Sequence, residues 1–223
     1  MKIYLTGDTH GGKELNRLRE FCDRHPELTD DDFVIILGNA LGTSVDEYES
    51  ILDQYQELPP TILFLDGNED NYDYLSRFEV VDFFSGRVQK LRQNVIHLMR
   101  SEVYVFENTK VFVLGGGDSF DKDYLIQNNI PWFIEEAPTL EDLKKGLKKL
   151  DEHGNLVDFV LTHDSPSSAF LYTPSEKIKL TTKILDKIDQ KVKCNRWYFG
   201  HYHHDMPVNS NKTIVYQKFI RIK

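Results

Sequence analysis

The first third of the chain alternates short apolar runs with amphipathic stretches. Residues 2–6, 33–37 and 61–65 read KIYLT, FVIIL and TILFL, which is the continuous apolar character of strands buried on both faces. Between them, apolar residues recur at helical spacing over 13–25 and 45–58. The order strand, helix, strand, helix, strand is typical of a parallel sheet built by right-handed crossovers.

The middle of the chain is spaced differently. Short β-type runs over 88–91, 95–98, 102–106 and 110–116 leave no room for crossover helices, so we expect antiparallel pairing among them. No repeat or linker marks a boundary, and we expect a single domain over 1–223. The other predicted elements are helices over 71–78, 121–127, 139–153 and 181–189 and strands over 157–161, 196–199, 213–217 and 219–222.

Composition narrows the class of protein. The 223 residues include 36 Asp and Glu against 27 Lys and Arg, and the net charge of -9 opposes broad binding to nucleic acid or to anionic membranes. Cys22 and Cys194 form no CxxC pair, which suits a reducing compartment. The start of the chain lacks the pattern of a signal peptide, and no stretch approaches the roughly 18 apolar residues of a membrane span. We therefore expect a cytoplasmic protein, whose oligomeric state the sequence does not indicate.

Five of the apolar runs end abruptly in a small polar cluster. Because ligands of α/β sheets bind beyond the carboxyl ends of the strands, we expect these clusters to lie close together. In chain order, the clusters contain Asp8, His10, Asn39, Asn68, Glu69, His163, His201 and His203.

These side chains are of the types that bind metal ions. Asp8 and His10 are two residues apart on extended backbone, as are His201 and His203, so each pair points to one side and can share an ion. Carboxylate, imidazole and amide ligands suit manganese, iron, zinc or nickel, and no thiolate narrows the choice. Each cluster alone has an ordinary interpretation as a turn or a helix cap, so only the combination favours a metal site.

The ordered series of motifs resembles the calcineurin-like metallophosphoesterase superfamily, in particular its small bacterial and phage members. GDTHG, LGN, DGNED, THD and GHYH run from residue 7 to residue 203 in the order of that family. The resemblance implies an α/β fold, a four-layer αββα sandwich of two mixed sheets flanked by helices. It also implies two divalent metal ions, among which we favour manganese over iron, zinc and nickel. On the family's pattern the ligands are Asp8, His10 and His203 for one ion and Asn68, His163 and His201 for the other.

Two positions depart from the family's pattern. Asn39 stands where an aspartate bridges the ions, and its neutral amide removes one negative charge, so the affinity for at least one ion should fall. Glu69 stands where a histidine binds phosphate and assists the leaving group, and an ionised carboxylate there repels an anionic substrate. Three accounts stay open: an active enzyme in which Glu69 restores the lost charge, a natural inactive protein that binds a ligand or partner, or an engineered inactive form.

The expected substrate is a small phosphomonoester or phosphodiester, with Asp8, Asn39 and Glu69 as the candidate catalytic residues. The chain lacks the GDxxDRG segment of protein phosphatases and has Asp66 where they have an arginine.

Two loops are candidates for lining the substrate cleft. The loop 115–125 lines the cleft through backbone N–H groups and Lys122, as we favour, or is a turn that caps a helix through Asp118 or Ser119, and the two roles are compatible. Trp132 and its neighbour Phe133 form either a wall for a nucleobase or, as we favour, a lid packed on the core.

Overall fold

The strands of the computed structural model, which describes residues 1–42, 44–169 and 179–223, form two mixed sheets. The first has the order β13-β1-β2-β3-β6-β5-β4, with bounds β1 (Ile3–Thr6), β2 (Phe33–Ile36), β3 (Thr61–Phe64), β4 (Val80–Phe83), β5 (Gly86–Arg92), β6 (Val95–Leu98) and β13 (Ile220–Arg221). The second has the order β11-β12-β10-β9-β8-β7, with bounds β7 (Glu102–Phe106), β8 (Thr109–Leu114), β9 (Leu156–Thr162), β10 (Lys193–Phe199), β11 (Met206–Pro207) and β12 (Lys212–Ile214).

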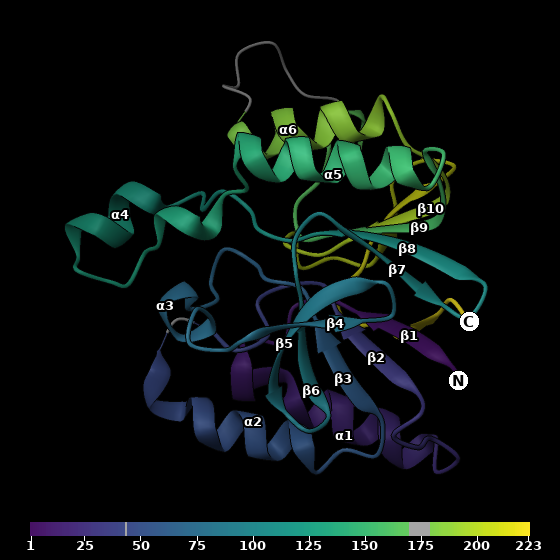
Figure 1. Cartoon of the computed structure of the whole chain (residues 1–223). Coiled ribbons are helices and arrows are strands. Elements are labelled where there is room, and N and C mark those ends of the chain that lie inside the picture. The colour runs from purple at the N-terminus through teal and green to yellow at the C-terminus, as the bar shows by residue number, and fades with distance from the viewer. Residues whose placement is uncertain (43, 170–178) are drawn as a thin grey trace.

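Helices cover the outer faces of both sheets and make the four layers visible in Figure 1. The α/β sandwich expected from the motifs is therefore confirmed. Within the described part of the chain, no helix is both long and apolar enough to cross a membrane. The helices are α1 (Leu15–Arg24) and α2 (Tyr48–Gln56) on the first sheet, with α3 (Tyr72–Leu75) nearby, α5 (Leu140–Glu152) and α6 (Leu180–Asp189) on the second sheet, and α4 (Lys122–Gln127), which projects from the side of the molecule.

The apolar character of the strands follows from their burial on both faces. In β1, Ile3 and Leu5 belong to the core between the sheets, whereas the intervening Tyr4 packs with Leu18 and Phe21 of α1. A third core cluster lies between the second sheet and helices α5 and α6. Each inner strand therefore has no polar face, and the sequence of such a strand reads as an unbroken apolar run.

The pairing of the strands agrees with the prediction in the first third and differs from it in the middle. Strands β1, β2 and β3 pair in parallel, and the hairpins β5–β6 and β7–β8 are antiparallel, as expected. However, β6 also pairs in parallel with β3, and β8 with β9, because each hairpin adds its inner strand to an existing parallel sheet. The sequence prediction missed β4 and β11, both of which carry exposed residues at the end of a sheet.

Candidate metal centre

The polar clusters lie together at one rim, where the carboxyl ends of parallel strands from both sheets meet. His163 follows β9 in the second sheet, and its Nδ1 donates to the backbone oxygen of Leu37, just after β2 in the first sheet, over 2.8 Å. The backbone N–H of His201, which follows β10, donates to Asp8 Oδ1 over 3.0 Å. The chain thus brings the predicted ligands of both sheets to a common edge.

Several of these residues hold an uncommon backbone conformation. The φ angles of His10, Asn39, His201 and His203 are 45°, 51°, 65° and 48°, in the left-handed region that residues other than glycine rarely adopt. Such strain persists where the surrounding structure fixes it, and it is concentrated at functional sites. The turns after β1, β2 and β10 are therefore shaped to aim these side chains inward.

Asp8, His10 and His203, which we call the Asp8 group, place three donor atoms close together. One donor atom from each lies within 4.8 Å of the others. Asp8 Oδ2 is 3.4 Å from His203 Nε2 and 3.8 Å from His10 Nε2, and the two imidazole nitrogens are 2.9 Å apart. Burial raises the pKa of Asp8, but the neighbouring His163, His203 and His10 lower it by more, so the carboxyl is an anion. The group offers one anionic and two imidazole ligands to a cation.

Glu69 orients one imidazole of the Asp8 group. Its Oε2 lies 3.2 Å from His10 Nδ1, and because an ionised carboxylate only accepts, His10 Nδ1 carries the proton. His10 Nε2 then turns a lone pair towards His203 and Asp8. The hydrogen bond from His10 also lowers the pKa of Glu69. In known metal sites, a carboxylate placed in this way behind a histidine fixes the tautomer of the ring.

The Asn68 group, as we call Asn68, His163 and His201, contains two acceptor atoms that face each other. His163 Nδ1 donates to a carbonyl, so in the neutral ring Nε2 is an acceptor, yet it faces Asn68 Oδ1 over 2.9 Å. The Asn68 amide is held in this orientation because its Nδ2 donates to Ser119 Oγ over 3.2 Å. Two acceptors in this position require a proton or a metal cation between them.

His201 lies beside His163, with the two ring centroids 4.8 Å apart, and it brings a third acceptor to the Asn68 group. Its Nε2 is buried and has no hydrogen-bond partner among the described residues. Burial, and after it the charge of His163, lowers the pKa of His201 to about 3, so the ring is neutral at physiological pH. A buried imidazole without a partner is costly unless a ligand satisfies it, and its chemistry fits a divalent metal ion.

Asn39 lies between the two groups. Its Oδ1 accepts the backbone N–H of Glu69 over 2.9 Å. Its Nδ2 donates to Asp8 Oδ2 over 3.0 Å and to Asn68 Oδ1 over 3.4 Å, one atom from each group. The structure therefore places Asn39 at the shared edge of the two predicted ion positions, with the N–H bonds of its amide directed at both.

The glycine before Asn39 makes this close packing possible. Gly38 has a φ of 98°, and a Cβ atom added to it would lie 2.1 Å from His163 Nδ1. Any side chain at this position displaces the imidazole ring.

The loop after β8 forms one wall of the centre and of a neighbouring pocket. Ser119 contacts Asn68, and the Asp118 carboxylate accepts the N–H of Thr181 in α6 over 3.0 Å. The prediction that Asp118 or Ser119 caps the next helix is therefore wrong, because α4 begins after Asp121 and both side chains bond elsewhere.

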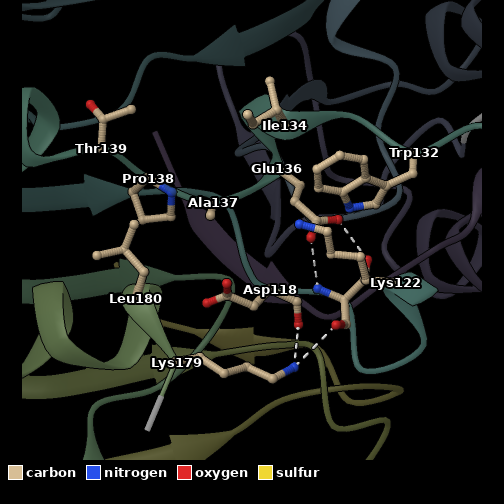
Figure 2. A pocket seen from close by; sticks show the side chains of 11 residues that line it. Asp118, Lys122, Trp132, Ile134, Glu136, Ala137, Pro138, Thr139, Lys179 and Leu180 are labelled. Carbon is tan, nitrogen blue, oxygen red and sulfur yellow. Dashed lines mark hydrogen bonds between the residues drawn. The ribbon is translucent and has the colours of Figure 1, made fainter. Parts of the chain in front are cut away.

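The pocket has a volume of about 450 Å³ and is shown in Figure 2. It is lined by Ser119, Lys122, Trp132, Ile134 and Lys179, among others. Lys122 Nζ lies 4.0 Å from the centroid of the Trp132 ring. Trp132 lies outside the three core clusters of the described residues, so the interpretation of this stretch as a core-packed lid is wrong for Trp132. The nucleobase wall stays a prediction.

Two contributors to the centre were missed from the sequence. The exposed ring of Phe120 stacks on His201, with centroids 4.9 Å apart, and its only signal is a large apolar residue within a polar loop. Arg17 of α1 donates from Nη2 to the backbone oxygen of Asp8 over 3.1 Å. Nothing in the helical pattern distinguishes Arg17 from the other charged residues of α1.

Comparisons with known proteins concern the fold and the family of the chain. The chain is similar in fold to the protein TT1561 of Thermus thermophilus, at 13% identity and a TM-score of 0.56, over 99% of this chain and 97% of that one. A phosphopantetheinyl hydrolase of Mycobacterium tuberculosis matches over 97% of this chain and 90% of its own, at 13% identity and a TM-score of 0.47. No curated protein matches the sequence. The calcineurin-like phosphoesterase family matches residues 1–205, and the chain belongs to that family.

Proposed function

We propose that the protein is a metal-dependent phosphoesterase that hydrolyses a small phosphomonoester or phosphodiester. The observation that carries the proposal is the convergence of the Asp8 group and the Asn68 group at one rim, with acceptor atoms that face each other or lack a partner among the described residues. Membership of a family whose members are generally metal-dependent hydrolases supports the same reaction type. The donor set contains oxygen and nitrogen, which suits manganese, our favoured metal, as well as iron, zinc and nickel.

The chemistry divides between the ions and the residues of the chain. When bound, divalent ions would supply positive charge for the phosphoryl oxygens and would lower the pKa of a water molecule, which could then act as a nucleophile at neutral pH. Asp8 contributes the negative charge to the site of one ion, and Asn39 fixes Asp8 and Asn68 by hydrogen bonds. Glu69 orients His10 through its Oε2, so we assign Glu69 to positioning and not to proton donation.

The size of the substrate is inferred from the surroundings of the centre. Asp66 replaces the arginine of protein phosphatases, and it is tied to Arg100 by a hydrogen bond of 2.6 Å, which supports a small ester over a phosphoprotein. The pocket beside Ser119 offers about 450 Å³ of space, with Trp132 and Ile134 as apolar walls, for the organic part of such an ester.

A second candidate function is noncatalytic binding of a phosphate-containing ligand or a protein partner. The observation that favours it is the Asn39 amide, whose N–H bonds point at both groups where the family has an anionic bridge.

The two candidates are distinguished by assaying the chain beside Asn39→Asp, Glu69→His and the double variant. Each is loaded with Mn²⁺ and tested on an aryl phosphate and a bis-aryl phosphate. Activity of the unchanged chain that disappears in His163→Ala supports the phosphoesterase. Activity that appears only in the reverted variants supports the binding protein. If all four metal-loaded proteins are inactive on both esters, the proposed hydrolysis of small phosphate esters is wrong.

A further inference from the structure

The amide of Asn39 is fixed in one orientation by its neighbours. Its Oδ1 accepts the N–H of Glu69 over 2.9 Å, so exchanging Oδ1 and Nδ2 would set one donor against another. There is no space to avoid this clash, since a Cβ atom added to Gly67 would lie only 2.1 Å from Asn39 Oδ1. Leaving a buried N–H without an acceptor is costly. The orientation that directs N–H bonds at the two groups is therefore favoured.

An aspartate at this position can both accept the N–H of Glu69 and bind metal ions, whereas an asparagine can only accept the N–H. One oxygen of an aspartate accepts the Glu69 N–H, and the other offers its lone pairs to metal ions. In Asn39 that second atom is Nδ2, whose lone pair is delocalised into the amide and whose hydrogens point at Asp8 Oδ2 and Asn68 Oδ1. Asn39 thus brings two hydrogen-bond donors to the place where a bridging ligand is required.

The two groups differ in charge once Asn39 contributes no ligand. The Asp8 group contains a buried carboxylate, and a second carboxylate, Glu69, lies behind its His10. The Asn68 group consists of an amide oxygen and two imidazoles and contains no carboxylate. A divalent cation in the Asn68 group must be desolvated without an anionic ligand of its own, which lowers its affinity.

We propose that the protein holds one divalent ion tightly, in the Asp8 group, and a second ion only weakly, in the Asn68 group. Asn39 causes the difference, and Glu69 is a positioning residue that strengthens the first site by fixing His10. This inference rests on the proposed metal-dependent function and deepens it, because it assigns unequal roles to the two positions.

The number of tightly bound ions tests the first part without any assay of activity. The full chain and Asn39→Asp are stripped with a chelator, incubated with Mn²⁺ or Zn²⁺, desalted and analysed by elemental mass spectrometry. We expect about one ion per unchanged chain and about two per Asn39→Asp chain, and a calorimetric titration should show a second, weak step only in the former. Two tightly bound ions in the unchanged chain, or one in both proteins, overturn the inference and leave the proposed function standing. No tightly bound ion in either protein overturns both.

The affinity of the first ion tests the role of Glu69. Glu69→Ala removes the acceptor for His10 Nδ1, and we expect the Kd of the first ion to rise about 10- to 100-fold, the range found for partners of metal-bound histidines. Glu69→Gln keeps an acceptor oxygen, so its Kd for the first ion should lie between the values of the unchanged chain and of Glu69→Ala. Glu141→Gln, on an exposed helix face, is the matched control. The absorption spectrum of bound Co²⁺ should change with Glu69→Ala and stay constant in the control. An unchanged Kd in Glu69→Ala overturns the assignment of Glu69.

Discussion

Arg100 holds the carboxylate of Asp66 inside the protein. Arg100 Nε donates to Asp66 Oδ2 over 2.6 Å, and His97 Nε2 lies 3.1 Å from the other oxygen. Burial raises the pKa of Asp66, but Arg100 and His97 lower it by more, so the carboxyl stays ionised. Asp66 directly precedes Gly67 and Asn68, so the pair of Asp66 and Arg100 supports the turn that carries Asn68 of the candidate metal centre.

Removing Arg100 should destabilise the protein strongly. Arg100→Met leaves Asp66 buried, charged and without its main partner, and we expect the free energy of unfolding to fall by about 3–5 kcal/mol. Arg92 is the control, because its partners Glu49 and Asp53 are mostly exposed, and Arg92→Met should lose no more than about 1 kcal/mol. Urea unfolding of the metal-free proteins measures both. If both variants lost the same free energy of unfolding, the buried pair of Asp66 and Arg100 would stabilise the protein no more than an exposed pair.

Glu102 should make the stability depend on pH. Its side chain is fully buried in β7, where Arg87 Nε and Lys145 Nζ each lie 2.8 Å from Oε1. Burial raises the pKa of Glu102, but Lys145 and Arg87 lower it by more. A carboxyl whose pKa is lowered on folding stabilises above its unfolded pKa, about 4.3, and loses this contribution as the pH falls through its folded pKa.

We therefore expect Glu102→Gln to lower the free energy of unfolding by about 1–3 kcal/mol at neutral pH. The difference from the unchanged chain should shrink as the pH falls below about 4. Denaturant unfolding at several pH values measures this trend, with the exposed Glu141→Gln as the control. A difference that stays constant down to the lowest pH would show that Glu102 acts through packing and not through its charge.

Gly38→Ala should damage the metal centre beyond its effect on the backbone. An alanine in this left-handed conformation costs about 1–2 kcal/mol, and its methyl group would also displace His163. Gly154 is the matched control, since its φ is also positive, 66°, and its added Cβ would meet no atom of the described chain within 4 Å. Both variants should unfold at a lower temperature, but only Gly38→Ala should bind Mn²⁺ more weakly. Equal metal affinities would mean that the His163 ring has room to move.

Trp132→Ala should weaken binding of aromatic esters. If the pocket holds the organic part of the substrate, the loss of one stacking partner raises KM for an aryl phosphate about 3- to 10-fold, with little effect on an alkyl phosphate. Tyr124→Ala is the control, because Tyr124 lies on the neighbouring helix α4 and does not line the pocket. A rise in KM that is the same for both esters would place the organic group elsewhere.

The sequence predicted the inner strands well and the outer ones poorly, for a physical reason. An inner strand such as β2 is buried on both faces, so its apolar run FVII is unambiguous. In β4, residues such as Val80 are exposed and the strand pairs on one side only, so its composition is close to that of a loop. Strand β11 contains only Met206 and Pro207, too short for any periodicity.

The candidate site follows a similar rule. His201 and His203 could be proposed from the chemistry of their side chains at the end of a strand. The expectation that they lie on extended backbone and share an ion is wrong, because both have left-handed backbone and only His203 lies with Asp8 and His10. The orientation of Asn39 was not predictable, since it depends on the backbone N–H of Glu69 from another turn. Arg17 and Phe120 contribute through contacts that only the tertiary structure creates.

The hydrogen bonds from His163 to Leu37 and from His201 to Asp8 each join one sheet to the other. The same residues that are candidates to hold cations therefore also fasten the two halves of the sandwich at its rim. Binding of a cation should therefore stabilise the contact between the two sheets. We expect amide protons of β2 and β9 to exchange with deuterated solvent more slowly when the ions are present. In this architecture, removal of the metal ions would lower the stability of the sandwich as well as any activity that depends on the ions.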